Sequence, residues 1–170
     1  MIYPKELKPT LSEIFQLSSN KRIEIPKANI HFEKWFDEKI EDTYGGKTII
    51  NFNDEAVFAE LAILRIFENN GWSGVWVDTF RKKYRTDWIN KNGVELSSDR
   101  QIFLNKIYKN LDSKIGCWDV FCWKEKRVIF VESKRQSKDK IRETQIRFLE
   151  SALNCGLSKE SFLIVEWTLA

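Results

Sequence analysis

Two carboxylates and a lysine stand on strand-like runs in the second half of the chain, Asp119 on the first run and Glu132 with Lys134 on the second. The runs cover residues 117–123 and 127–134, and the short polar stretch between them predicts a β-hairpin. An even-numbered turn pairs Asp119 with Glu132, whereas a three-residue loop would shift this register by one. Like charges on directly opposed residues repel, so the even register indicates a cation between the two carboxylates.

The expected cation is Mg²⁺, for which Mn²⁺ can substitute, because hard divalent ions prefer carboxylate and carbonyl oxygens and complete their shells with water and phosphate oxygens. Lys134 lies two residues after Glu132, so both side chains project from one face of a strand. A metal ion activates a bound water, while a nearby lysine orients that water and stabilises negative charge in the transition state. This chemistry is phosphodiester hydrolysis. A Glu-x-Lys pattern is also common at solvated strand ends, but here it follows the apolar run 128–131, where unpaired charges are costly.

Two further polar residues lie on apolar helical faces. Glu60 has apolar residues three and four positions away in both directions. It either pairs with a buried basic residue or reaches the metal, directly or through water. Gln145 shares a helical face with Ile141 and Phe148, so its amide either is satisfied in the core or binds a catalytic neighbour or a phosphate.

The elements that must position these residues read as one α/β domain in the order helix, strand, inserted helix, strand, strand, helix, strand. The first helix is expected over residues 56–67, with Asn53 or Asp54 as its N-cap and Gly71 as its stop. A strand follows at residues 75–80, where β-branched and aromatic residues gather. The first helix should therefore be buried on most sides.

Two more helices and a final strand complete this order. Within an insertion covering residues 81–114, Ser98 and Gln101 have the spacing of a capping box that opens a helix ending near Leu111. Ser137 is the expected cap of the last helix, which Gly156 ends. The apolar residues 162–165 predict a buried strand near the C-terminus.

Composition supports one domain over residues 1–170. The chain is 42% hydrophobic and 31% charged, which suffices for a core, and residues 1–52 read as an N-terminal extension packed on that domain. We expect a cytoplasmic protein with no membrane association, because Met1–Thr10 lacks a signal-peptide core and no apolar run could span a bilayer. Three cysteines without paired spacing and a single histidine argue against disulfides, a zinc motif and imidazole-based sites.

The pattern resembles the PD-(D/E)XK nuclease superfamily, and in detail its VRR-NUC branch. The resemblance is carried by Gly116-Cys117-Trp118-Asp119, by Glu132-Ser133-Lys134 and by Thr144-Gln145, and it covers about residues 54–167. It implies a restriction-endonuclease-like α-β-β-β-α-β core with a central mixed sheet flanked by helices. It also implies that Asp119, Glu132, Ser133 and Glu60 surround the metal, that Lys134 is the catalytic lysine, and that Gln145 is the glutamine of the following helix.

Basic residues support a nucleic-acid partner at the same place, with DNA favoured over RNA. Phosphate contacts from such residues position nucleic acid without reading its sequence. The candidates follow the catalytic strand or lie in the insertion: Arg135, Lys138, Lys140, Arg142, Arg147, Arg81, Lys82, Lys83 and Arg85. The insertion could clamp substrate or contribute to a homodimer. Trp72, Trp76 and Trp88 could stack on bases, although tryptophans in such segments more often belong to the core.

Two alternatives stay open beside a DNA nuclease. One is a catalytically inactive module on the same fold that binds nucleic acid or protein. The other is an RNA-cleaving toxin or effector. The complete set of Asp119, Glu132 and Lys134 argues against the inactive module.

Overall fold

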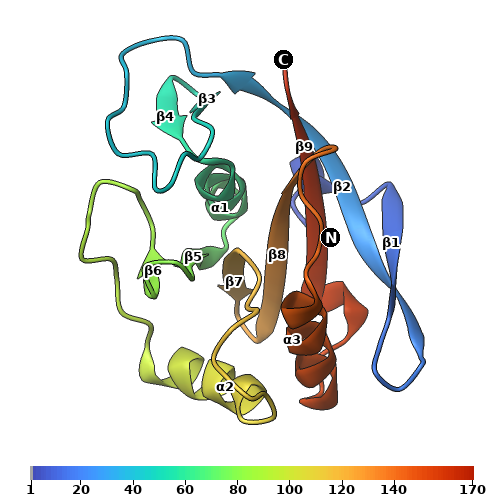
Figure 1. Ribbon diagram of the computed structural model, residues 1–170. Coiled ribbons are helices and arrows are strands. Elements are labelled where there is room, and N and C mark those ends of the chain that lie inside the picture. The colour runs from blue at the N-terminus through green and yellow to red at the C-terminus, as the bar shows by residue number, and fades with distance from the viewer. Residues whose placement is uncertain (1) are drawn as a thin grey trace.

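The structure, a computed structural model that describes residues 2–170, is an α/β protein with helices on both faces of one mixed sheet (Figure 1). The α-helices are α1 (Ala59–Asn69), α2 (Ser98–Tyr108) and α3 (Glu143–Asn154). The strands are β1 (Leu11–Gln16), β2 (Arg22–Lys34), β3 (Ile50–Phe52), β4 (Glu55–Val57), β5 (Ser73–Asp78), β6 (Lys83–Arg85), β7 (Val120–Lys124), β8 (Arg127–Arg135) and β9 (Phe162–Leu169). No helix within residues 2–170 has both the length and the apolar character needed to cross a membrane.

The sheet follows the order β4-β3-β2-β9-β8-β7-β5-β6, with β1 paired to β2. β9 lies between β2 and β8 and runs parallel to both, while the other pairs are antiparallel. From α1 to β9 the elements follow the predicted order, and the insertion contributes β6 as well as α2. The α/β class and the mixed sheet are thus confirmed.

Side chains along β8 point alternately to the two faces of the sheet, and each face carries one layer of the core. Ile129 and Val131 pack in the cluster that contains α1, whereas Val128 and Phe130 pack in the cluster that contains α2 and α3. Successive strand residues point to opposite faces, so a fully buried strand serves both layers. Positions 132 and 134 continue the face that α3 covers.

The predicted hairpin register is confirmed. Val120 pairs with Val131 and Trp123 with Val128, so the numbers of paired residues sum to the value that an even turn requires. Glu125, at a φ of 55°, opens the two-residue turn between β7 and β8. The printed pairs end at Val120 and Val131, and the same register extended by one position, just beyond the end of β7, would set Asp119 opposite Glu132.

The predicted N-cap of the first helix is wrong. Asn53 and Asp54 have φ values of 52° and 63° and form the two-residue turn between β3 and β4. Left-handed backbone at both positions is the geometry of a tight hairpin turn, which asparagine and aspartate tolerate better than most residues. Helix α1 therefore begins later than predicted, at Ala59.

Two other predicted caps are also wrong. Ser97, not Ser98, precedes α2, its hydroxyl bonds to Asp99, and the helix ends at Tyr108. Ser137 has a φ of 61° and lies in a turn after β8, so α3 starts only at Glu143.

Three strands of the N-terminal segment, β1, β2 and β3, continue the sheet and do not lie over it as an extension. Residues 27–32 of β2 pair in parallel with residues 164–169 of β9, and β1 pairs along the first half of β2. Strand β2 passes through Pro26, which lies opposite Ser12 of β1. The first third of the chain is therefore next to the candidate site.

Candidate active site

Asp119 directly precedes β7 and is held by hydrogen bonds from β5 and β8. Its carbonyl accepts a hydrogen bond of 2.7 Å from the backbone N–H of Val77 in β5, and its Oδ2 accepts one of 2.9 Å from the backbone N–H of Ser133 in β8. Within a strand, the N–H and C=O of one residue point to the same neighbour. The carbonyl of Ser133 thus faces the Asp119 side, as a ligand role for Ser133 requires.

A close approach at Gly116 brings the start of α3 to this place. Gly116 has a φ of +84°, and a Cβ there would lie 2.1 Å from the carbonyl oxygen of Thr144. Any other residue would push the two segments apart. The buried indole of Trp118 then donates to the carbonyl of Gln145 at 3.2 Å.

Glu132 is 7% exposed, and its two oxygens differ. Oε1 accepts a hydrogen bond of 2.5 Å from Nε2 of Gln145, whereas Oε2 is buried without a hydrogen-bond partner in the described chain. The amide oxygen of Gln145 accepts from the backbone N–H of Arg142 at 2.8 Å, which fixes the orientation of the amide. Of the roles predicted for Gln145, the structure shows contact with a neighbour in the candidate site, Glu132.

Burial and nearby carboxylates raise the proton affinity of both Asp119 and Glu132. Burial, followed by the charge of Glu60, raises the pKa of Asp119 to about 7, although part of its side chain remains accessible. Burial, followed by the charge of Asp119, raises the pKa of Glu132 well above its ordinary value. Crowded carboxylates without a matching cation behave in this way.

Lys47 is a site residue that the sequence did not reveal. It precedes β3 in an irregular loop and forms an ion pair with Glu60, which is 8% exposed at the start of α1. Burial alone would lower the pKa of Lys47, but the charges of Glu60 and then Asp119 raise it. Of the two roles left open for Glu60, the structure shows pairing with a basic residue.

Glu13 is the second residue that sequence reasoning missed. Its carboxylate, on β1, binds the Lys134 ammonium at 3.0 Å and 3.1 Å. Lys134 is buried, so its charge requires such a partner. A strand 121 residues earlier in the chain therefore reaches the predicted catalytic lysine.

Asp119 and Glu132, with the Ser133 carbonyl, fit a hard divalent cation. The unpartnered Oε2 of Glu132 is a buried acceptor with free lone pairs, and a cation would remove the repulsion between the two carboxylates. Across residues 2–170, no three histidine, cysteine, aspartate or glutamate side chains form a ready-made metal cluster. Two carboxylates nonetheless suit Mg²⁺, which keeps several waters.

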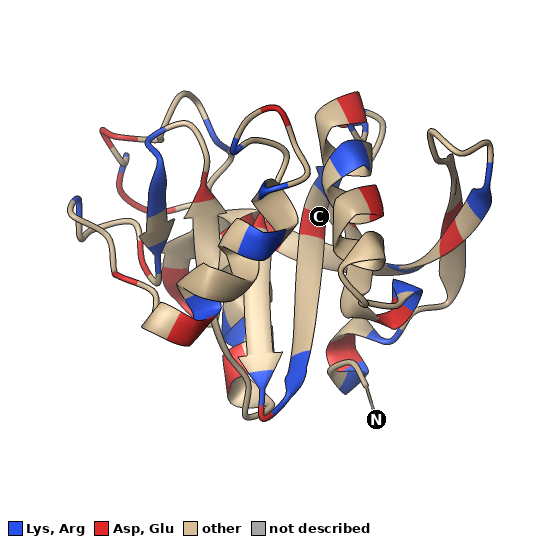
Figure 2. Ribbon diagram, turned by 90° about the horizontal axis from the view of Figure 1, so that it is seen from below, with Lys and Arg blue, Asp and Glu red and all other residues tan. Residues whose placement is uncertain are grey.

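The basic residues predicted to bind phosphate differ in accessibility. Arg135 is half-buried, stacks on Trp167 and donates to the hydroxyl of Thr48 at 3.0 Å. Lys83 donates to the carbonyl of Lys91 at 2.6 Å. The exposed members of the set are Lys82, Lys138, Lys140, Arg142 and Arg147. In the view of Figure 2, basic and acidic positions are interspersed along the ribbon.

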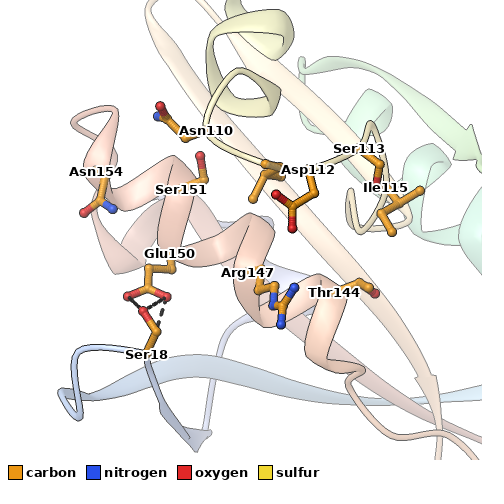
Figure 3. A pocket seen from close by; sticks show the side chains of 11 residues that line it. Ser18, Asn110, Asp112, Ser113, Ile115, Thr144, Arg147, Glu150, Ser151 and Asn154 are labelled. Atoms are coloured by element: carbon orange, nitrogen blue, oxygen red, sulfur yellow. Dashed lines mark hydrogen bonds between the residues drawn. The ribbon is translucent and has the colours of Figure 1, made fainter.

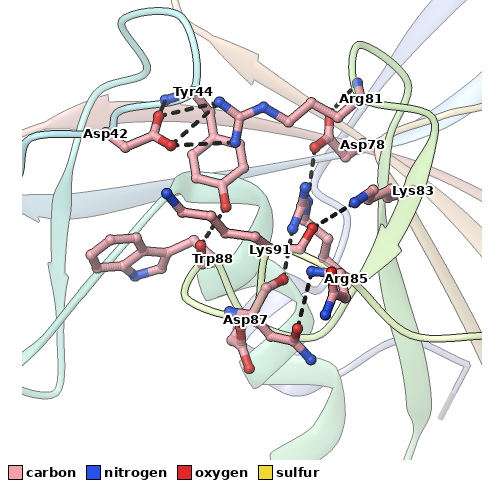
Figure 4. A network of polar contacts seen from close by, with 11 residues as sticks. Asp42, Tyr44, Asp78, Arg81, Lys83, Arg85, Asp87, Trp88 and Lys91 are labelled. Carbon is pink, nitrogen blue, oxygen red and sulfur yellow. Dashed lines mark hydrogen bonds and ion pairs between the residues drawn. The ribbon is translucent and has the colours of Figure 1, made fainter.

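Arg85 does not belong to the accessible set. It is 1% exposed, and its Nε donates to Asp78 at 2.8 Å (Figure 4). Arg81 stacks on the Tyr44 ring at 3.8 Å and pairs with Asp42. Arg85 therefore holds the insertion to β5, and the prediction that it contacts nucleic acid is wrong.

Two hollows flank these elements. A groove of about 420 Å³ lies between α3, the loop after α2 and the β1–β2 turn, and Figure 3 shows Arg147, Thr144 and Asp112 along it. A second hollow, of about 520 Å³, has Trp35, Tyr44 and Trp88 among its lining residues.

The tryptophans predicted to stack on bases also differ in accessibility. Trp72 and Trp76 belong to the core, which was the alternative to base stacking. Trp88 is only half-buried and lines the second hollow.

We compared the chain with family models, curated proteins and solved structures. None of them matches it.

Proposed function

We propose that this protein is a metal-dependent nuclease that hydrolyses phosphodiester bonds, with DNA the favoured substrate. The observation that carries the proposal is the proximity of Glu132 and Asp119, together with one buried Glu132 oxygen that has no hydrogen-bond partner within residues 2–170. A buried carboxylate oxygen without a hydrogen bond is an acceptor that a bound cation can satisfy. The resemblance to PD-(D/E)XK nucleases, on the same residues, supports the same reaction.

In this proposal Asp119, Glu132 and the Ser133 carbonyl hold Mg²⁺ or Mn²⁺. When bound, the cation would lower the pKa of a coordinated water and neutralise charge on the phosphate. Gln145 orients Glu132 through its hydrogen bond to Oε1. Lys134 supplies a positive charge next to the scissile phosphate and orients the attacking water.

The roles of Glu60 and the exposed cations are less direct. Glu60 and Lys47 set the electrostatic field at Asp119 from the α1 side. Exposed residues after β8 and at the start of α3, Lys138, Lys140 and Arg142, contact the phosphate backbone and position the strand.

The proposal is tested by incubating the protein with labelled single-stranded DNA, duplex DNA, branched DNA and RNA in parallel. Each substrate is tested with Mg²⁺, with Mn²⁺ and with EDTA, for wild type and Asp119→Ala. Cutting that requires metal and is lost in the variant supports a nuclease and identifies its substrate, including the RNA-cleaving alternative. Binding without cutting, equal in both proteins, would instead support the inactive binding module.

A further inference from the structure

Lys134 is anchored from outside the elements that the nuclease resemblance covers. Its side chain is 9% exposed, and both of its side-chain hydrogen bonds within residues 2–170 go to the two oxygens of Glu13. Glu13 lies on β1, in the segment that the sequence had marked only as an extension. A buried ammonium that makes two bonds to one carboxylate has a well-defined position.

The sheet register alone would give Lys134 a different partner. Glu166 of β9 is its direct neighbour across the parallel β8–β9 pair. Lys27 of β2 takes that carboxylate instead, at 3.0 Å, and also lies 3.7 Å from Glu13. Four charges from four strands thus alternate as Glu166, Lys27, Glu13 and Lys134, and each carboxylate contacts a lysine.

The strand that carries Glu13 is braced. Phe15, two residues further along β1, is 7% exposed and packs in the same core cluster as α3. At the turn after β1, the hydroxyl of Ser18 donates to Glu150 of α3 at 2.8 Å, at one end of the groove in Figure 3. All six residues of β1 pair with β2. Glu13 is therefore presented by a fixed strand.

We propose that Glu13 is the positioning residue for Lys134, holding its ammonium on the face of β8 that also carries Glu132. The inference rests on the proposed nuclease function and adds a residue from the N-terminal hairpin to that site. A lysine side chain has about 2 kcal/mol of rotamer entropy, so an unanchored Lys134 would spend less time in the productive geometry. Misplacement of a catalytic group by about 1 Å can cost a factor of about 100 in rate.

The experiment compares kcat and KM of wild type, Glu13→Gln and Glu13→Asp on the substrate that wild type cuts, at saturating Mg²⁺. The expected result for Glu13→Gln is a fall in kcat of about 10- to 100-fold with KM within about threefold, because orientation and not ground-state binding is lost. Glu13→Asp keeps the charge and should recover part of kcat. Glu24→Gln, an exposed carboxylate on β2 of the same hairpin, is the matched control and should leave both constants unchanged.

The Lys134→Ala background separates positioning from a general effect on the fold. If Glu13 acts through Lys134, adding Glu13→Gln to Lys134→Ala causes no further loss. An equal loss in both backgrounds, or an unchanged or raised kcat in Glu13→Gln, overturns the inference while leaving the nuclease intact. If Glu13→Gln unfolds, Glu13→Asp carries the test. The inference would be contradicted if Glu13→Asp had the kcat of wild type when Lys134 is present but lowered kcat further when added to Lys134→Ala. If wild type does not cut any substrate, the proposed function fails and this inference fails with it.

Discussion

The backbone N–H of Ser133 donates a hydrogen bond of 2.9 Å to Oδ2 of Asp119, at the end of the β7–β8 hairpin. This bond joins the residue before β7 to the strand that carries Glu132 and Lys134. It sets the carboxylate of Asp119 beside that of Glu132 before any cation is bound. The unfavourable proximity of two acids is therefore built into the fold, and its consequences can be measured.

Stability should fall as pH rises when no metal is present. Asp119 keeps its proton up to about pH 7 in the folded chain, whereas an aspartate in an unfolded chain loses it near pH 4. Between these values the folded state binds more protons, so the free energy of unfolding decreases with increasing pH, at most by a few kcal/mol, about 1.4 kcal/mol per pKa unit. Glu132, whose pKa is also raised, acts in the same direction.

Urea denaturation in EDTA between pH 4 and pH 8 measures this decrease. Asp119→Asn cannot titrate at this position and should show a smaller dependence on pH. Saturating Mg²⁺ should oppose the decrease at pH 8, since an ion present at about 100 times its Kd stabilises the folded state by about 2.7 kcal/mol. A wild-type stability that rose from pH 5 to pH 7 in EDTA would contradict the electrostatics described above.

Gln145→Leu should weaken metal binding. The substitution removes the donor to Oε1 of Glu132, so that carboxylate is no longer oriented. Loss of such a supporting contact typically costs 10- to 100-fold in metal affinity or activity, and we expect the Mg²⁺ concentration for half-maximal cutting to rise by about that factor. Gln136→Leu, at an exposed position after β8, is the control and should change nothing.

Lys47→Met should destabilise the protein through Glu60. Removing one partner of a buried pair leaves the other charge without compensation, and because Lys47 is partly exposed we expect a loss of about 1–3 kcal/mol, less than for a fully buried pair. The double variant with Glu60→Gln should regain much of this loss. Thermal or urea denaturation measures both, and additive losses in the double variant would show that the two residues do not interact.

Arg85→Met should cost about 3–5 kcal/mol of stability, because it leaves Asp78 buried without its partner. Arg81→Met is the matched control: its pair with Asp42 is exposed to solvent, so the loss should be much smaller. Urea denaturation of the two variants decides the comparison. If the two losses were equal, the buried and the exposed pair would not differ as the structure indicates.

Sequence alone could predict those features of the site that depend on residues close together in the chain. The register that opposes Asp119 and Glu132 follows from a polar two-residue turn between two apolar runs. The predicted helix that carries Gln145 also exists, although it starts later than Ser137 indicated. The N-cap prediction at Asn53 and Asp54 was wrong for a physical reason, since the same residue types favour helix caps and left-handed turns.

The remaining part depends on contacts between distant segments. Strand β2 was not predicted because Pro26 and its many polar residues conceal a strand whose partner, β9, lies more than a hundred residues away in the chain. Glu13 became visible as a site residue only after β1 paired with β2. Lys47 lies in an irregular loop, where no periodic pattern indicates its contact with Glu60.

Metal-dependent cutting through Glu132 can be measured as the initial rate of wild type and Glu132→Gln at equal Mg²⁺ concentration, on the same labelled strand. Glutamine keeps the size of the side chain and its contact with Gln145 but removes the charge needed for a metal ligand. We expect Mg²⁺-dependent cutting by wild type and a loss of at least about 100-fold in the variant, consistent with removal of an electrostatic contribution of about 3 kcal/mol. Equal rates in the two proteins, or cutting by wild type that persists in EDTA, would contradict it.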